Sequence, residues 1–199
     1  EDGSFSSSTP GGPVYGSLTQ PTALGSGGGW CSASAGGAAG GGALKLVVLG
    51  TLTLNGTISA NGGTFSGLSA AGGGSGGSLW ISAGTFTGTN NTATLSANGG
   101  NGTSYSSTYT YRCGGDSFWG FQTCTGVRTF SGGGGAGGRI ALYYTTKTYA
   151  GTPPQALGGS GSGGISQPGG SGTIHEVGPA TQLGFVASSL PGTTGAGQE

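Results

Sequence analysis

The sequence predicts an all-β fold: a glycine-rich parallel β-helix, or solenoid, of about three to four repeats with extended terminal arms. Three observations lead to this fold class. One layout, consisting of a glycine pair, an alternating strand, a glycine turn and a second strand, recurs along the chain. Glycine makes up 52 of the 199 residues, far above its usual share of about 7%. Glycine also interrupts every stretch that would otherwise suit a helix. A repeated unit of this kind buries its apolar face only by stacking on a neighbour.

The repeat has three full copies and one truncated copy. They read GGALKLVVLGTLTLNGTISANGG (41–63), GGSLWISAGTFTGTNNTATLSANGG (76–100), GGRIALYYTTKTYAGTPPQALGG (137–159) and GSGTIHEV (170–177). The first inward position recurs after 35 residues between Leu44 and Leu79, and after 34 between Ile140 and Ile174. The 61 residues from Leu79 to Ile140 are one period plus 26 or 27 residues, an excess that matches the compositionally distinct segment 101–129. That segment is therefore expected to be an insertion that emerges as a loop.

Two terminal arms flank the repeats and are too poor in apolar residues to fold alone. The predicted domain organisation is an N-terminal arm at 1–24, a solenoid at 25–177 and a C-terminal arm at 178–199. Each arm carries a few apolar residues suited to anchoring an added strand on a neighbouring subunit. These are Val14, Tyr15, Leu18, Phe185 and Val186. No polar cap follows Val177 in the sequence, so the last strand is expected to end in an uncapped edge.

Period-2 alternation assigns the faces of the repeated strands. Apolar residues take the inward positions, while threonine recurs on the outward positions. We expect five inward side chains to be buried: Leu46, Leu52, Ile81, Phe86 and Leu142. The glycine clusters before each strand suit tight corners of the coil, or close approach between backbones of neighbouring layers. Pro153 and Pro154 interrupt the third copy and make its last strand doubtful.

The three cysteines predict one disulfide. Cys113 and Cys124 lie 11 residues apart and bracket an aromatic loop that has few other means of staying ordered. A bond between them would contribute about 2 to 3 kcal/mol through chain entropy. Cys31 is left over, and an odd cysteine in an extracellular protein indicates a bond to another chain or a buried free thiol. The alternative is three reduced cysteines packed as small hydrophobic residues.

The charge pattern argues against several classes of partner. The formal net charge is zero and the five basic residues are scattered, so no electrostatic footprint for nucleic acid exists. The longest apolar run, 44–49, is interrupted by a lysine and is far shorter than the roughly 18 residues of a membrane-spanning helix. The chain opens at Glu1 without methionine, as expected either of a trimmed chain or of processing that removes a signal peptide. We expect no nucleic acid partner, no membrane insertion, and a location outside the cell or on its surface.

The acidic residues are too few for polysaccharide-cleaving enzymes on β-helical folds, which need clustered carboxylates. Asp116 and Glu176 are the only acids away from the chain ends, and His175 is the only histidine. Matches to G-x-S-x-G and G-x-G-x-x-G within 72–77 arise from glycine content and do not follow a strand. We therefore expect no enzyme activity, no metal site and no cofactor.

Three N-x-[ST] sequons mark candidate N-glycosylation sites at Asn55, Asn90 and Asn101. Chance occurrence is an equal alternative in a chain this rich in Asn, Ser and Thr. Asn55 and Asn90 fall at aligned turns of the first two copies, where a glycan would project from the edge of the solenoid.

Aromatic residues in and beside the insertion form a candidate contact surface. Together with Trp80, which takes an outward position, this surface comprises Tyr109, Tyr111, Phe118, Trp119 and Phe121. Exposed aromatic clusters mark contacts with sugar rings, with another subunit or with the protein's own flank. Self-packing or subunit contact is the favoured interpretation, and ligand binding is the alternative.

The segments GGALKLVVLGTLTLNGTISANGG, GGSLWISAGTFTG and GGGGAGGRIALYY together resemble the glycine-rich β-solenoid repeats of large surface and secreted proteins from microbial eukaryotes and bacteria. In those repeats a GGSIWI-like strand precedes GTISANGG and then GGGGRIAIYY. The resemblance covers about 25–177 and implies an extracellular β-helical fold, with no activity to carry over. The cysteine-bearing insertion and the Pro153–Pro154 pair depart from the pattern.

The leading hypothesis is a structural subunit of an extracellular, glycosylated fibre or surface coat. Such a subunit assembles with copies of itself by strand contacts at open solenoid ends. The alternative is an adhesin that binds carbohydrate through the aromatic insertion. Two weaker alternatives are a polysaccharide lyase and an ice-binding solenoid, the latter suggested by Thr51-Leu52-Thr53, Thr85-Phe86-Thr87 and Thr92-Ala93-Thr94. A flat threonine array should persist along the stack, but the third copy offers Thr146-Lys147-Thr148. The expected partner is the chain itself, with glycans as the alternative partner.

Overall fold

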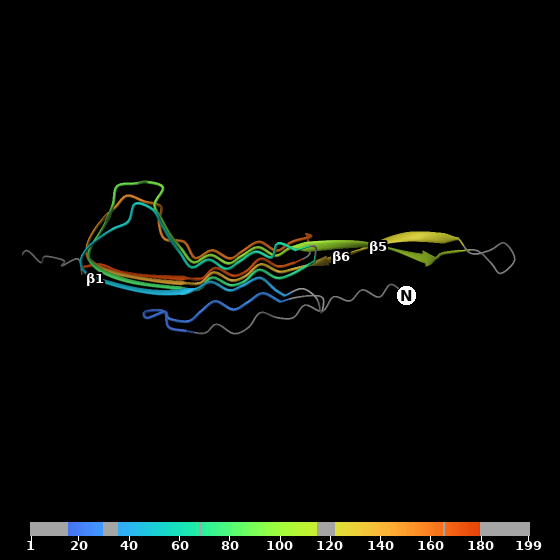
Figure 1. The fold of residues 1–199 in the computed structure, drawn as a ribbon, viewed down its shortest axis with the longest axis horizontal. Coiled ribbons are helices and arrows are strands. Elements are labelled where there is room, and N and C mark those ends of the chain that lie inside the picture. Colours follow the sequence, from blue (N-terminus) through green and yellow to red (C-terminus); the bar gives the residue numbers. More distant parts are fainter. Residues whose placement is uncertain (1–15, 30–35, 68, 115–121, 165, 180–199) are drawn as a thin grey trace, which may run out of the picture.

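The computed structural model describes residues 16–29, 36–67, 69–114, 122–164 and 166–179 (Figure 1). This part of the chain is all-β and contains no helix. Its strands are β1 (Ala43–Thr53), β2 (Thr57–Ser59), β3 (Ser78–Gly88), β4 (Thr94–Ser96), β5 (Ser104–Arg112), β6 (Thr123–Ser131), β7 (Arg139–Tyr149) and β8 (Thr173–Val177). They form a four-stranded sheet in the order β1-β3-β7-β8 and two two-stranded sheets, β2-β4 and β5-β6. None of these sheets closes on itself.

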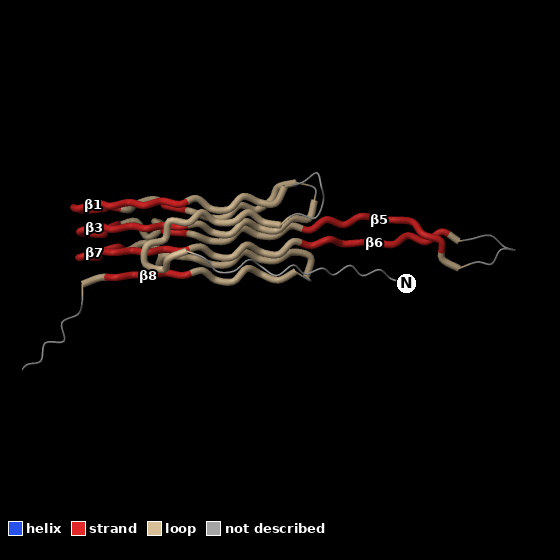
Figure 2. The backbone as a smooth tube through the Cα atoms, turned by 90° about the horizontal axis from the view of Figure 1, so that it is seen from below, coloured by secondary structure: helices blue, strands red, loops and turns tan. Residues whose placement is uncertain are grey.

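The four-stranded sheet is parallel throughout, and its register reproduces the alignment of the sequence repeats. Leu44 lies opposite Leu79, Leu79 lies opposite Ile140, and Ile140 lies opposite Ile174. Figure 2 shows the resulting stack, in which β1 and β8 are the outermost strands. The sequence period is therefore the step from one layer to the next, and the truncated copy is β8.

The second parallel pair, β2 with β4, belongs to the first two of these layers, with Ile58 opposite Leu95. In the third layer this strand pairing continues as an isolated bridge between Ser96 and Gln155. Pro154 comes directly before the bridge, and proline has no N–H to donate to a ladder. The doubtful last strand of the third copy is thus reduced to a single bridge.

The apolar core joins inward side chains of β3 and β7 to side chains of β4. Ile81, Phe86 and Leu142 are fully buried there, as predicted. The same prediction for Leu46 and Leu52 was wrong, because both are only half-buried. They belong to β1, the outermost strand, so a neighbouring layer covers them on one side only.

Threonines form two columns across the first three layers of the sheet. Thr51, Thr85 and Thr146 make one column, and Thr53, Thr87 and Thr148 make the other. Thr148 donates a hydrogen bond of 2.9 Å to the hydroxyl oxygen of Thr87. The threonine array suggested by the sequence therefore persists through three layers.

Glycine-rich segments flank the strands in every layer. Those before the long strands are called entry segments here (36–42, 72–77, 132–138 and 169–172), and those after the short strands are called exit segments (60–63, 97–102 and 156–160). They do not form corners: among the described residues, positive φ is confined to Gly16, Gly114, Gly163 and Gly164. Both kinds run as extended backbone, visible as the wavy traces beside the sheet in Figure 1.

Close approach between backbones is what requires glycine in these segments. A Cβ atom at Gly73 would overlap the carbonyl group of Gly100, and one at Gly135 would overlap the carbonyl group of Gly74. A larger residue at either position would have to push neighbouring segments apart. The sequence suggests two roles for the glycine clusters, tight corners or close approach between backbones, and the structure shows close approach.

The hydrogen bonds of an entry segment point in three directions in turn. In the second layer, the N–H of Gly73 donates to Gly133 of the third layer at 3.0 Å, and that of Gly74 donates to the exit segment at 3.0 Å. The N–H of Ser75 points away from both and donates to Ser26 at 2.9 Å. The remaining N–H groups repeat this order: that of Gly72 donates to the same side as Ser75, that of Gly76 to the third layer, and that of Gly77 to the exit segment. A three-residue period is that of a polyproline II helix, whereas a β-strand has a period of two.

Residues 25–29, called the outer segment here, form a further line of backbone against the entry segments. The N–H groups of Gly25 and Gly28 donate to the first layer, both at 2.8 Å. The carbonyl groups of Ser26 and Gly29 accept from the second layer, at 2.9 and 2.8 Å. The outer segment therefore bridges two layers of the stack.

The chain before the outer segment lies across the four-stranded sheet. The Tyr143 hydroxyl donates to the carbonyl oxygen of Thr19 at 2.7 Å, and the Ser78 hydroxyl donates to that of Ala23 at 2.6 Å. The described part of the predicted N-terminal arm, 16–24, thus packs on its own chain.

Strands β5 and β6 form an antiparallel hairpin that projects from the end of the molecule opposite β1 (Figures 1 and 2). The hairpin corresponds to the predicted insertion. Cys113 and Cys124 are joined by the predicted disulfide, with their Cα atoms 5.7 Å apart. Cys31 lies outside the described residues.

Candidate functional site

The candidate site consists of the two ends of the four-stranded sheet, because an outermost strand is where a further chain could add. At one end, β1 pairs with β3 along one edge, and no described strand pairs with its other edge. Its inward side chains Leu46, Val48 and Leu52 are half-buried. Leu49 is 95% exposed and Val47 is 56% exposed. This end of the stack is apolar and open.

The opposite end differs in chemistry, because charged residues occupy inward positions there. Glu176 of β8 lies opposite Leu142 of β7, and Lys147 of β7 lies opposite Phe86 of β3. Both therefore take the places that core residues hold in the layers before them. Tyr144 lies on β7 between Lys147 and Leu142, the register partner of Glu176. Its own partner on β3 is Ala83.

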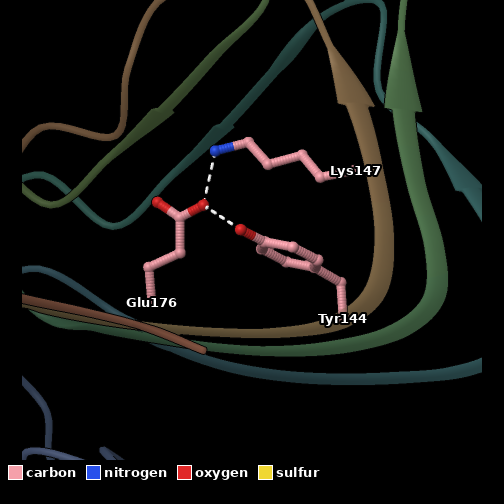
Figure 3. A network of polar contacts seen from close by, with 3 residues as sticks. All are labelled: Tyr144, Lys147 and Glu176. Carbon is pink, nitrogen blue, oxygen red and sulfur yellow. Dashed lines mark hydrogen bonds and ion pairs between the residues drawn. The ribbon is translucent and has the colours of Figure 1, made fainter. Parts of the chain in front are cut away.

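These three side chains form one polar network (Figure 3). The Tyr144 hydroxyl donates to Oε1 of Glu176 at 2.7 Å, and Nζ of Lys147 forms an ion pair with the same oxygen. Partial burial by itself raises the pKa of Glu176, but hydrogen bonds from Lys147 and Tyr144 and the lysine charge outweigh it, so the pKa lies below its usual value. The hydrogen bond to Glu176, with burial and the carboxylate charge, raises the pKa of Tyr144.

The network acts as a polar cap on the β8 end. Inward-pointing charges are one way in which proteins discourage further strands from pairing with a sheet edge. The expectation that no polar cap follows Val177 stays a prediction, because the chain beyond Pro179 lies outside the described residues. Alternation from Ile174 would have placed Glu176 inward, and aligning Thr146-Lys147-Thr148 with Thr85-Phe86-Thr87 would have placed Lys147 in the inward position of Phe86. Their opposite charges were the missed signal.

The outer face of the sheet carries a shallow depression of about 360 Å³. It is lined by Gln20, Lys45, Val47, Trp80, Ser82 and Tyr143. Nζ of Lys45 lies 3.7 Å from the centre of the Trp80 ring, a cation–π contact across the register of β1 and β3. The lysine therefore covers one face of the Trp80 ring.

The predicted contact residues fall into separate places. Trp80 lies on the four-stranded sheet, at one end of the molecule. Tyr109 and Tyr111 lie on the hairpin, which projects from the other end of the molecule, away from that sheet (Figure 1). Phe118, Trp119 and Phe121 lie outside the described residues. The structure therefore does not bring Trp80 together with the aromatic residues of the insertion.

One face of the hairpin is aromatic and exposed. Tyr105, Tyr109 and Tyr111 are 42 to 48% exposed. The rings of Tyr109 and Tyr111 are 5.7 Å apart, and the Arg128 guanidinium lies 5.4 Å from the Tyr109 ring. Gly126 lies opposite Tyr109, where a Cβ atom would collide with the ring. Glycine at this position lets the tyrosine ring lie across the partner strand.

All three sequon asparagines are exposed. The side-chain oxygen of Asn55 accepts from the Thr89 N–H at 3.0 Å, and its Nδ2 has no hydrogen bond within the described residues. Nδ2 of Asn90 donates to the carbonyl of Asn55 at 3.1 Å. The side-chain oxygen of Asn101 accepts from the Ser160 N–H at 2.8 Å. The side-chain oxygens of Asn55 and Asn101 thus each bond the next layer.

Among the predicted assembly residues, Leu18 is described and is 47% exposed. Val14, Tyr15, Phe185 and Val186 lie outside the described residues, as does Asp116. The described ranges contain no group of three or more His, Cys, Asp or Glu side chains that could hold a metal ion. They also contain no helix long and apolar enough to cross a membrane.

Comparison of the chain with models of protein families, with curated proteins and with solved structures gives no match.

Proposed function

We propose that this chain is a glycine-rich β-solenoid and a structural subunit of an extracellular, glycosylated fibre or surface coat. The observation that carries the proposal is the open β1 end, where an unpaired strand edge adjoins half-buried Leu46, Val48 and Leu52. A strand added there would bury these side chains as a neighbouring layer buries Ile81. Main-chain hydrogen bonds would supply affinity, and the alternating side chains would fix the register.

The strand that adds is the C-terminal arm, 178–199, of another copy. Residues 16–24 already pack on their own sheet, whereas the chain leaves β8 at the end of the stack opposite β1. When copies stack end to end, this arm begins next to the β1 edge of the following copy. The inserted strand would also keep the apolar β1 end apart from the ion pair of Lys147 and Glu176.

Deletion of 178–199 tests this arrangement. We expect electron microscopy to show filaments of the full chain and none of the truncated protein. Deletion of 1–15 is the matched control, because it removes an arm of similar length but leaves β1, β8 and 16–24 in place. A full chain that stays monomeric at high concentration, or filaments that survive the loss of 178–199, would contradict the proposal.

A second test changes the β1 edge itself. Leu46→Glu would place at this end an inward carboxylate like that of Glu176 at the other end, and it should abolish filaments. Val127→Glu adds the same charge at an exposed position of the hairpin, away from both ends of the four-stranded sheet, and serves as the control. Circular dichroism checks that both variants remain folded.

A carbohydrate-binding adhesin is the second candidate, and the exposed aromatic face of the hairpin favours it. Three tyrosines on one face of a two-stranded sheet, with Arg128 beside them, suit stacking against sugar rings. Glycan-array binding that is lost with Tyr109→Ala and kept with Ser106→Ala would support this function. Because the hairpin lies far from β1, such a result would not depend on filament formation.

A further inference from the structure

Among the described residues, the outer face of the entry segments is only half covered. The outer segment lies over the first and second layers, where Gly72 and Ser75 donate to it. The residues in the same position of the third layer, 61 residues later, are Gly133 and Ala136. Both are exposed, and their N–H groups donate no hydrogen bond within the described residues. The third layer therefore repeats the donor pattern of the second without its acceptor.

Unpaired acceptors lie beside these donors. The carbonyl oxygens of Gly134 and Gly137 accept no backbone hydrogen bond among the described residues. Their counterparts in the first layer, Ala38 and Gly41, accept from the outer segment at 2.8 Å each. The exposed face thus offers both donors and acceptors, each recurring after three residues.

Among the described residues, no neighbouring atom requires glycine at position 133. A Cβ atom at each other glycine of this entry segment would overlap neighbouring backbone, and these glycines are Gly132, Gly134, Gly135, Gly137 and Gly138. At Gly133 it would meet just one atom, 3.4 Å away, and at Gly170 of the fourth layer it would meet nothing within 4 Å. Glycine costs about 0.5 to 1 kcal/mol relative to alanine in regular structure. Residues without a Cβ atom on an exposed face allow a second backbone to approach closely.

We propose that this glycine face, formed by the entry segments 132–138 and 169–172, binds the same face of a second copy. The surface continues the interface that the outer segment makes over the first two layers. It contains no charged residue, so two such faces meet without like-charge repulsion. Donors and acceptors on one face make it self-complementary, as a two-fold contact requires. The proposal extends the structural function to side-by-side contacts between subunits and uses a surface separate from the β1 edge.

The double variant Gly133→Val, Gly170→Val tests the glycine face. Both side chains would point into open space, so the unfolding midpoint of the monomer should not change. They would hold the two backbones apart and remove at least two main-chain hydrogen bonds, each about a fivefold effect on affinity. We expect the dissociation constant of the side-by-side dimer to rise at least about tenfold. Gly56→Val is the control, because Gly56 is also exposed with open space around its Cβ position.

Sedimentation equilibrium on the full-length Leu46→Glu protein measures this dimer without filaments. A dimer that the double variant weakens supports the glycine face even if filaments prove not to depend on the C-terminal arm. A monomer at all concentrations, or an unchanged dissociation constant in the double variant, would overturn the proposal.

Amide hydrogen exchange provides the second measurement. Exchange at Gly133 and Ala136 should slow as the protein concentration rises, while exchange at Gly56 should stay constant. Slow exchange at any concentration would show that the chain's own residues cover the face, and would also overturn the proposal.

Discussion

Ile81 is fully buried between two layers, with Leu46 opposite it in β1 and Leu142 opposite it in β7. Ile81→Ala would leave a cavity that both neighbours would have to fill. We expect the free energy of unfolding to fall by about 2 to 5 kcal/mol, measured by urea denaturation. Val47→Ala, at an exposed position on β1, is the control and should change it by less than about 0.5 kcal/mol. Equal losses for the two variants would contradict the register of the sheet.

Glu176 should make stability depend on pH on the acid side. Its pKa is lowered in the folded state, so the stabilisation is present above the usual carboxyl value of about 4.3 and is lost as the pH falls through the folded pKa. Because the pair is partly exposed, we expect about 0.5 to 1 kcal/mol. Glu176→Gln should reduce stability at pH 7 and have little effect at pH 2. Thermal unfolding of both proteins across this range measures the difference, and a loss that is the same at both pH values would exclude the ion pair as its cause.

At the scale of a single element, we expect the stability of the β5–β6 hairpin to depend on its disulfide. Its strands pair with each other and with no other strand in the described residues. Changing both Cys113 and Cys124 to serine should destabilise the hairpin by about 2 to 3 kcal/mol. Hydrogen exchange should become faster in β5 and β6 and stay unchanged in β3. In the wild-type protein, a non-reduced digest should contain the two cysteine peptides linked. A link from Cys31 to either one would contradict the pairing.

Strands can be predicted from the sequence, whereas the entry segments cannot. Alternation and a repeat of nearly constant length are enough to align Leu79 with Ile140, and the two residues are register partners in the sheet. Glycine carries no side-chain pattern, so nothing in GGGGAGG reveals that its hydrogen bonds turn through three directions. The ion pair of Lys147 and Glu176 escapes prediction for another reason. Inward charges are rare, so two charged residues 29 positions apart suggest separate places on the surface.

For the whole molecule, the layers should differ in stability according to their place in the stack. β3 and β7 have strands on both sides, whereas β1 and β8 each have a strand on one side within the described chain. In repeat structures of this kind, stability comes from contacts between neighbours. We expect the slowest hydrogen exchange in β3 and β7, and faster exchange in β1 and β8. Uniform exchange across all four strands in the monomer would show that the layers unfold as one unit.

The three-directional bonding of the entry segments also sets which changes of chain length the fold accepts. Removing one residue from 72–77 would turn every later donor of that segment by about 120° and would reverse the faces of β3 if the strand kept its place. Removing three residues would restore the donor directions but shift the strand along its neighbours. A complete additional layer of about 35 residues, by contrast, keeps every bond direction and every strand register. Length variation in natural or engineered versions of this chain should therefore occur in whole layers and in the hairpin, and single-residue insertions or deletions should be absent from its glycine segments.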